Sequence, residues 1–182
     1  MADIILVTGG ARSGKSGFAL EQAEKISSKR LFIATCPKID EEMSKRVVRH
    51  QEERRGRGWA SEEVELDLAR VFKRSTNQYD VILIDCITLW VNNVLHKYDL
   101  EGTRLDDAVI KQLCLEWLKV AKTFKGTVIC VTNEVGLGIV PDNELARNYR
   151  DLVGTCNQLI GSMATRAVLV SCGIPLVLKD GL

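Results

Sequence analysis

Several kinds of segment are missing from this sequence of 182 residues, and each absence excludes a class of protein. No apolar run reaches the roughly 18–20 residues that a membrane-spanning helix needs. The apolar stretch Ile4–Val7 is too short for a signal sequence, and no basic region precedes it. With only three prolines and 46% apolar residues, most of the chain cannot be disordered. We therefore expect a folded, cytoplasmic protein.

An excess of charge of one sign is also absent, because 25 Lys and Arg residues face 24 Asp and Glu residues. A dedicated nucleic-acid-binding protein usually carries a clear basic excess, so nucleic acid is not an expected partner. The six cysteines form no CxxC pair, and most of them lie in apolar segments. A disulfide framework or a zinc site would need patterned spacing, so we expect reduced and mostly buried thiols.

The length predicts a single domain over residues 1–182. Short β-rich runs alternate with longer helical stretches, which predicts an α/β fold with a mostly parallel sheet and helices on both faces. Trp59–Leu66 is ambiguous, and a hairpin around Cys172–Gly173 would add an antiparallel strand at the C-terminus. The expected strands are Ile4–Thr8, Arg30–Ala34, Val81–Asp85, Thr127–Thr132, Ala167–Ser171 and Ile174–Leu178. The expected helices are Ser16–Ser28, Asp40–Arg55, Asp67–Ser75, Leu89–Lys97, Leu105–Phe124 and Asn143–Thr165.

The most specific short motif is a phosphate-binding loop, Gly9-Gly10-Ala11-Arg12-Ser13-Gly14-Lys15-Ser16, which matches G-x4-G-K-[ST] in full. Its glycines let successive backbone N–H groups point at phosphate oxygens, and the helix that follows adds the positive end of its dipole. Lys15 is expected to reach the β- and γ-phosphates, and the Ser16 hydroxyl to join a Mg2+ shell. Arg12 either contacts phosphate or is simply solvated.

A carboxylate for the same Mg2+ is expected at the end of the buried strand Val81–Asp85. Ligand sites form at the carboxyl edge of parallel sheets, so Asp85 joins Ser16 as a predicted metal ligand. The alternative role for Asp85 is the N-cap of the helix that follows. Taken alone, these residues indicate only a nucleoside triphosphatase or a transferase.

His50 and His96 are the only two histidines. His50 lies seven residues after Met43 and three after Val47, which on a helix places it on the same face as both. It is either a buried structural residue or a nucleophile toward phosphorus, since an imidazole with a pKa of ~6.5 is largely neutral near pH 7. The cations around it are either a solvated face or a surface for a triphosphate: Lys45, Arg46, Arg49, Arg54, Arg55 and Arg57.

Further motifs accompany the phosphate loop over nearly the whole chain, from Ile4 to about Ser171. They are Glu42-Met43 with Arg46-Val47 and His50, then Trp59 and Glu63; Asp85-Cys86-Ile87-Thr88-Leu89-Trp90 with Asn92-Asn93; Thr132-Asn133-Glu134-Val135-Gly136-Leu137-Gly138-Ile139-Val140-Pro141; and Leu145-Ala146-Arg147 with Arg150-Asp151, Gly154 and Asn157-Gln158. In these motifs the sequence resembles the bifunctional adenosylcobinamide kinase / adenosylcobinamide-phosphate guanylyltransferase family of cobalamin biosynthesis.

The resemblance implies a RecA-like phosphate-loop NTPase fold, a homo-oligomer that is typically a trimer, and two reactions. In the first, ATP or GTP phosphorylates the aminopropanol hydroxyl of adenosylcobinamide. In the second, GTP donates GMP to an enzyme histidine, and the GMP then passes to adenosylcobinamide phosphate. The products are adenosyl-GDP-cobinamide and pyrophosphate.

The resemblance also assigns residues. It makes His50 the nucleophile, while Lys15 is the second predicted catalytic residue on the strength of the phosphate loop itself. The nucleotide contacts that it implies are Gly9, Gly10, Ala11, Arg12, Ser13, Gly14, Lys15, Ser16, Ala34, Thr35, Cys36, Gln51, Glu52, Glu53, Arg54, Glu63 and Asp85.

One departure from the family pattern is Arg49, because some members carry two adjacent histidines where this chain has Arg49 and His50. A neighbouring positive charge disfavours imidazolium and helps to keep His50 neutral. The residues that bind the corrinoid stay open, as do the roles of Asn133, Glu134, Arg147 and Arg150. The main alternative is a monofunctional phosphate-loop small-molecule kinase with a structural His50, and another is a non-catalytic nucleotide-binding module.

Overall fold

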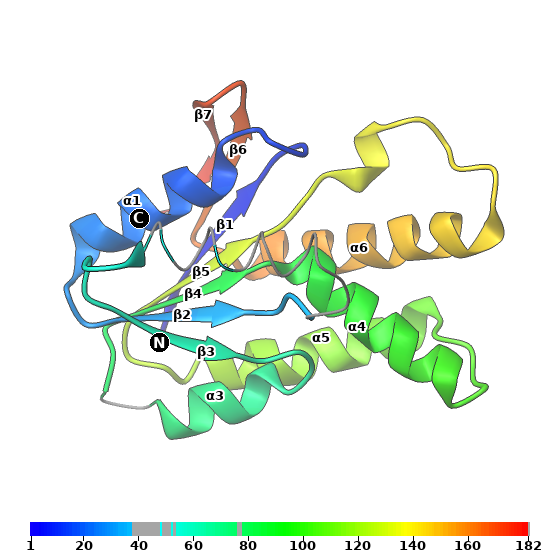
Figure 1. Ribbon diagram of the computed structural model, residues 1–182, viewed down its shortest axis with the longest axis horizontal. Helices are drawn as coiled ribbons and strands as arrows, with labels where there is room; N and C mark the ends of the chain where they lie inside the picture. The colour runs from blue at the N-terminus through cyan, green and yellow to red at the C-terminus, as the bar shows by residue number, and fades with distance from the viewer. Residues whose placement is uncertain (38–47, 49–51, 53, 76–77, 182) are drawn as a thin grey trace.

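The computed structural model describes residues 1–37, 48, 52, 54–75 and 78–181. These residues contain one seven-stranded sheet in the order β3-β2-β4-β5-β1-β6-β7 (Figure 1). All neighbouring strands are parallel except the last pair, β6 and β7. The strands are β1 (Asp3–Thr8), β2 (Arg30–Ala34), β3 (Trp59–Glu63), β4 (Val81–Asp85), β5 (Thr127–Val131), β6 (Arg166–Ser171) and β7 (Ile174–Asp180). The predicted mostly parallel α/β fold with an antiparallel C-terminal strand is confirmed.

Helices cover both faces of the sheet, with α1 on one face and α3, α4, α5 and α6 on the other (Figure 1). Ile5 and Val7 of β1 pack toward α1, whereas Ile4 and Leu6 pack toward the opposite helices. Burial on both faces explains why the central strands are apolar throughout. The helices are α1 (Lys15–Ile26), α3 (Leu68–Arg74), α4 (Ile87–Leu100), α5 (Asp107–Ala121), the short 3-10 helix η1 (Val135–Leu137) and α6 (Glu144–Met163).

The helices differ in how their first turns are satisfied. Asp67, Asp106 and Asn143 cap α3, α5 and α6, each accepting a backbone N–H three residues further on at 2.7–2.9 Å. Such caps stabilise a helix by about 1 kcal/mol each. At the start of α1 the N-cap residue is Gly14, which has no side chain to offer. The first N–H groups of α1 therefore stay available to an external acceptor.

The ambiguous segment Trp59–Leu66 forms β3, an edge strand parallel to β2. The sequence pattern did not predict this strand, because Ser61, Glu62 and Glu63 are polar and an edge strand need not be apolar on both faces. The hairpin around Cys172–Gly173 is confirmed, with both residues at positive φ. Four of the six free cysteines are buried, as expected: Cys86, Cys114, Cys130 and Cys156. Within the described residues, no helix is long and apolar enough to cross a membrane.

Candidate functional site

The carboxyl ends of the parallel strands bring several predicted residues into one row. In the registers of β3, β2, β4 and β5, Glu63 lies opposite Ala34, Ala34 opposite Asp85, and Asp85 opposite Val131. Val131 in turn lies opposite Val7 of β1, directly before the phosphate loop. Glu63, Ala34, Asp85 and the start of the phosphate loop thus share the edge at which ligands bind in such sheets.

Close backbone contacts shape the phosphate loop. A Cβ on Gly9 would lie 2.3 Å from the Val170 carbonyl oxygen, so only glycine fits there. Gly14 has φ +93°, and a Cβ on it would approach the Gly173 Cα to 3.2 Å. The Gly173 N–H donates to the Ser13 carbonyl at 2.8 Å. The β6–β7 turn therefore packs directly on the loop and fixes its curl.

Lys15 is buried at the start of α1, and its Nζ donates to the Gly10 carbonyl at 3.0 Å. Burial lowers the pKa of Lys15 below its ordinary value, and the negative charge of Asp85 acts in the opposite direction. A desolvated ammonium that donates to its own loop gains strongly from an incoming phosphate, because charge-assisted hydrogen bonds are the stronger ones.

Asp85 and Ser16 are both partly buried at this edge. The N-cap of α4 is Cys86, so the alternative N-cap role of Asp85 is not realised. Among the described residues, no group of three or more His, Cys, Asp and Glu side chains could hold a metal. Asp85 and Ser16 offer one carboxylate and one hydroxyl, and Mg2+ is usually bound through one or two carboxylates together with substrate phosphates.

Thr35 and Cys36 follow β2 at the same edge. The buried Thr35 hydroxyl donates to the Cys86 carbonyl at 2.7 Å and accepts from the Cys86 N–H at 2.8 Å. Asn93 of α4, which the sequence offered only as a motif residue without a partner, donates to the Thr35 carbonyl at 2.8 Å. Burial raises the pKa of the Cys86 thiol to about 11, which keeps it neutral beside Lys15 and Asp85. This part of the edge is therefore held by a closed set of hydrogen bonds.

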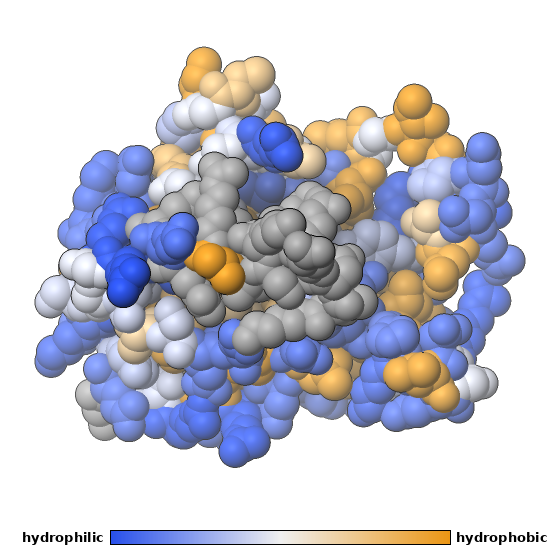
Figure 2. Space-filling model, viewed as in Figure 1, coloured by the Kyte–Doolittle hydropathy of each residue, from blue (hydrophilic) through white to orange (hydrophobic). Residues whose placement is uncertain are grey.

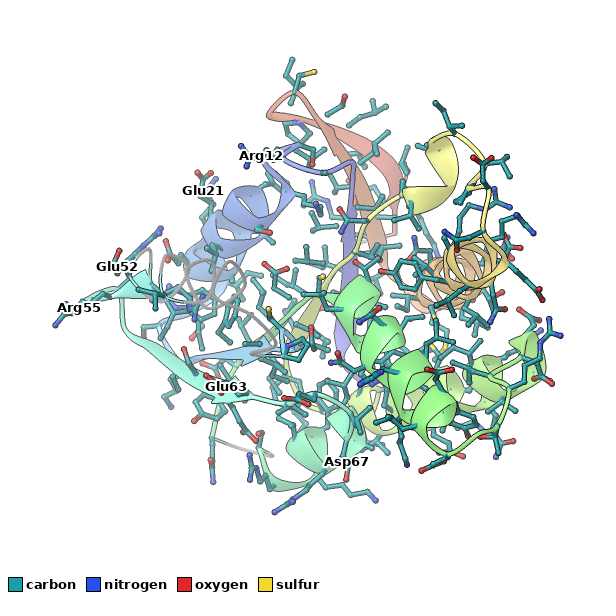
Figure 3. The ribbon with its side chains drawn as sticks, turned by 45° about the vertical axis from the view of Figure 1, so that its right-hand side comes forward. Arg12, Glu21, Glu52, Arg55, Glu63 and Asp67 are labelled. Carbon is teal, nitrogen blue, oxygen red and sulfur yellow. The ribbon has the colours of Figure 1, made fainter. Side chains whose placement is uncertain are left out.

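A hollow lies on the α1 side of β3, and we call it the basic pocket. Its volume is about 490 Å3, and its lining is Val48, Glu52, Arg54, Arg55, Gly56, Gly58, Trp59 and Ser61. The Arg54 guanidinium lies 3.5 Å from the centre of the Phe32 ring. The structure thus places Glu52 and Arg54 by the first half of β3, whereas Glu63 ends that strand (Figure 3).

Glu24 of α1 fixes one wall of the basic pocket, although no sequence pattern singled it out. The Trp59 indole donates to Glu24 Oε1 at 2.9 Å, and Arg57 forms an ion pair with the same carboxylate. Arg30 lies 5.0 Å from the Trp59 ring centre. Burial alone would raise the pKa of Glu24, but the hydrogen bonds from Trp59 and Arg57 outweigh it and hold that pKa below its ordinary value.

Three of the predicted site residues lie outside the described residues: His50, Gln51 and Glu53. Arg12 is exposed at the tip of the phosphate loop, with φ +56° (Figure 3). Arg147 donates to the Pro141 and Asp142 carbonyls at 3.0 and 2.6 Å, so it ties down the chain that precedes α6. Arg150 pairs with the neighbouring Asp151.

A hydrogen-bonded cluster adjoins the phosphate loop on the α6 side, and we call it the Glu134 network. Thr8 Oγ1 donates to Glu134 Oε1 at 2.5 Å, and Asn157 Nδ2 donates to the same oxygen at 3.3 Å. The buried Thr132 hydroxyl donates to Asn157 Oδ1 at 2.7 Å, and Asn157 Nδ2 also reaches the Asn133 carbonyl at 3.0 Å. The sequence singled out Asn133 and Glu134 without a role, and Asn157 only as part of a motif. It did not show that Thr8 and Asn157 are hydrogen-bond partners of this segment.

Comparison with known proteins gives consistent matches. The family model for cobinamide kinase / cobinamide phosphate guanyltransferase matches residues 5–178. The bifunctional adenosylcobalamin biosynthesis protein CobU of Escherichia coli is 36% identical, over 97% of this chain and 99% of that protein. The bifunctional adenosylcobalamin biosynthesis protein CobP of Pseudomonas aeruginosa is 37% identical, over 98% of both chains. An ATP synthase subunit from Nanoarchaeum equitans shares the fold, with a TM-score of 0.58 at 12% identity, over 93% of this chain and 45% of its own.

Proposed function

The chain belongs to the cobinamide kinase / cobinamide phosphate guanyltransferase family, and on that premise we propose how its residues divide two reactions. In the kinase reaction a nucleoside triphosphate phosphorylates adenosylcobinamide. In the guanylyltransferase reaction GMP passes from GTP through His50 to adenosylcobinamide phosphate, and pyrophosphate leaves. The observation that supports this most directly is the phosphate loop, with a buried Lys15 beside Asp85 and an uncapped α1.

Gly9–Ser16 holds the triphosphate in both reactions. The N–H groups of the loop and of the first turn of α1 point at the phosphate oxygens, and Lys15 exchanges its bond to the Gly10 carbonyl for phosphate. Ser16 and Asp85 hold Mg2+, which neutralises charge on the phosphates when it is bound. Phosphoryl transfer needs mainly positioning and charge neutralisation, so these residues supply much of the catalysis.

His50 supplies the covalent chemistry of the second reaction. Its neutral imidazole nitrogen forms a bond to the α-phosphorus of GTP, and the bond from that phosphorus to the bridging oxygen breaks with release of pyrophosphate. The GMP then moves from the imidazole to a phosphate oxygen of adenosylcobinamide phosphate. The contacts with the guanine nucleotide are Ala34, Thr35, Cys36, Gln51, Glu52, Glu53, Arg54 and Glu63, in addition to the phosphate loop and Asp85.

The deciding experiment is covalent labelling with GTP that carries the label on its α-phosphate. The wild-type protein with Mg2+ is expected to acquire one acid-labile, base-stable GMP, located by mass spectrometry at His50. His50→Asn is expected to abolish the label and to leave phosphorylation of adenosylcobinamide intact. His96→Asn is the matched control, because His96 is the other histidine and lies exposed near the end of α4.

The monofunctional kinase alternative gives a different result in the same experiment. A kinase without guanylyltransferase activity would acquire no GMP and release no pyrophosphate, while still phosphorylating adenosylcobinamide. A label that persists in His50→Asn would defeat the assignment of His50 and leave the two activities standing. We also propose that residues 1–182 act as one domain of a cytoplasmic protein. By family resemblance we propose a homotrimer, and light scattering of the purified protein tests this oligomeric state.

A further inference from the structure

Glu134 lies beside the phosphate loop but has no role in the two reactions as proposed above. It follows β5, which lies between β4 and β1 in the sheet. Its backbone N–H donates to the Gly9 carbonyl at 3.2 Å, so it touches the first residue of the loop. Asp85 stands at the end of the adjacent strand β4. The edge thus presents two carboxylates on neighbouring strands, and only Asp85 has a role in holding the nucleotide.

The Glu134 carboxylate is held by one of its two oxygens. The hydrogen bonds from Thr8 and from Asn157 both end on Oε1. Among the described residues, no hydrogen bond ends on Oε2 and no cation pairs with Glu134. A glutamine could accept the same two hydrogen bonds, so the packing alone does not require a negative charge. A carboxylate next to a triphosphate site costs electrostatic energy, and a chemical role explains why a charge stands there.

The rest of the Glu134 network fixes the direction of this carboxylate. Thr132 is fully buried and Asn157 is 9% exposed, and each is hydrogen-bonded within the network. Three elements therefore converge on Glu134: the end of β1, the end of β5 and the middle of α6. A group that is held in this way is pre-organised, which is what a proton acceptor in phosphoryl transfer needs.

The chain directly after Glu134 suits a large, partly apolar acceptor. Leu137, Ile139 and Val140 are 78%, 96% and 59% exposed. Figure 2 shows hydrophobic side chains gathered over this stretch, which joins η1 to α6 at the upper right of Figure 1. Arg147 holds the end of the stretch through the Pro141 and Asp142 carbonyls. The acceptor of the kinase reaction is a corrinoid, whose ring edge is rich in methyl groups and amides.

We propose that Glu134 is the catalytic residue that accepts the proton of the acceptor hydroxyl in the kinase reaction, an inference that rests on the proposed function. The hydroxyl oxygen of adenosylcobinamide forms a bond to the γ-phosphorus, and its proton passes to Glu134 Oε2. The bond between the γ-phosphorus and the bridging oxygen breaks, and the nucleoside diphosphate leaves with the electron pair. Guanylyl transfer needs no such proton acceptor, because neither the attacking nitrogen of the neutral imidazole nor the attacking phosphate oxygen carries a proton.

The test compares the two reactions in one variant, Glu134→Gln, which keeps the size of the side chain and an oxygen for Thr8. Its kcat for phosphorylation of adenosylcobinamide with ATP is expected to fall by about 10²–10⁴-fold, the usual contribution of a general base, with little change in the KM for ATP. Formation of the GMP–enzyme and transfer of GMP to supplied adenosylcobinamide phosphate are expected to stay within about twofold of wild type, since neither step uses this proton acceptor. Glu134→Asp, which keeps the carboxylate, is expected to retain more kinase activity than Glu134→Gln.

The control variant is Glu101→Gln, because Glu101 is an exposed carboxylate at the far end of α4 and should affect neither reaction. A kinase rate unchanged in Glu134→Gln would overturn the inference, and so would an equal loss in both reactions, which would mean a structural or nucleotide-binding role. If the wild-type protein transfers GMP but shows no kinase activity, that result contradicts the proposed function itself. An effect of Glu134→Gln on an active wild-type kinase tests the role of Glu134 separately.

Discussion

On the α6 side of the phosphate loop, buried Thr132 and Asn157 hold Glu134 in a closed set of hydrogen bonds. On the β3 side, an open pocket of about 490 Å3 is lined by exposed or partly exposed residues such as Arg55 and Trp59. The first region has one carboxylate in one orientation, whereas the second has two arginines, Arg54 and Arg55, and one carboxylate, Glu52, around a hollow. Such different constructions suit different tasks.

A kinase must place one hydroxyl against one phosphorus, and a rigid neighbour serves that purpose. A guanylyltransferase that forms a covalent intermediate must first admit GTP, then release pyrophosphate, and then admit a second substrate. An open, basic surface accommodates that sequence of anions. A substitution in the Glu134 network should therefore lower the kinase rate more, and one in the basic pocket should lower the guanylylation rate more. A substitution in the phosphate loop between them should lower both rates.

Lys15→Met lies between the sides and is expected to have the largest combined effect, because it affects both reactions. Both reactions use a triphosphate, so both rates should fall by about 10²–10³-fold, as when one preorganised donor is removed from an active site. The apoprotein should unfold at no lower a urea concentration, since the change removes a buried ammonium whose pKa burial has lowered. Rate assays and urea titration check this; a loss confined to one reaction would mean that the two reactions do not share the loop.

Asn157→Leu removes hydrogen bonds of the Glu134 network and should have the second-largest effect on activity. It removes a donor to Glu134 and leaves the buried Thr132 hydroxyl without its acceptor. The free energy of unfolding should fall by about 1–3 kcal/mol, the cost of an unsatisfied buried polar group. The kinase rate should fall more than the guanylylation rate in paired assays. If guanylylation suffers as much, the network supports the fold in general and not the kinase side in particular.

Glu24→Gln changes the wall of the basic pocket and should have the smallest effect. The free energy of unfolding should fall by less than about 1 kcal/mol, because the ion pair between Glu24 and Arg57 is partly exposed. The pKa of Glu24 is lowered in the folded state, so its stabilising contribution is present above the ordinary value of 4.5 and is lost as the pH falls through the folded-state value. The difference in unfolding free energy between wild type and variant should thus be largest at neutral pH and should vanish in acid. Urea titrations at several pH values measure it, and a difference that grows in acid would contradict the pairing.

The sequence predicted the interior of the sheet well, because strands buried on both faces must be apolar along their whole length. Val81–Asp85 was predicted with the bounds that the structure gives it, and β5 was predicted one residue too long. The hairpin followed from Cys172 and Gly173. The edge strand β3 could not be read in the same way, because its polar residues carry no such pattern.

The phosphate loop was predictable from a short motif, but the contacts beside it were not. Thr8 and Glu134 are 126 residues apart, and they meet only because β5 lies next to β1. Glu24 and Trp59 are 35 residues apart and meet across α1 and β3. Contacts of this kind depend on the order of strands in the sheet, which hydrophobic periodicity does not specify. The contacts implied at Ala34 and Glu63 came from family resemblance, whereas Asp85 was predicted from its place at the end of a buried strand. Their shared row is a result of register.

The hydrogen bond between Ser13 and Gly173 has a consequence for biosynthesis. The loop leaves the ribosome long before the turn that braces Ser13, and the neighbouring strand β1 pairs with β5 and β6, which are also made later than the loop. Long-range pairing of this kind forms late, and unpaired strands of a nascent chain invite aggregation. A chain interrupted shortly before Gly173 would thus hold every residue of the phosphate loop and still lack the brace that shapes it.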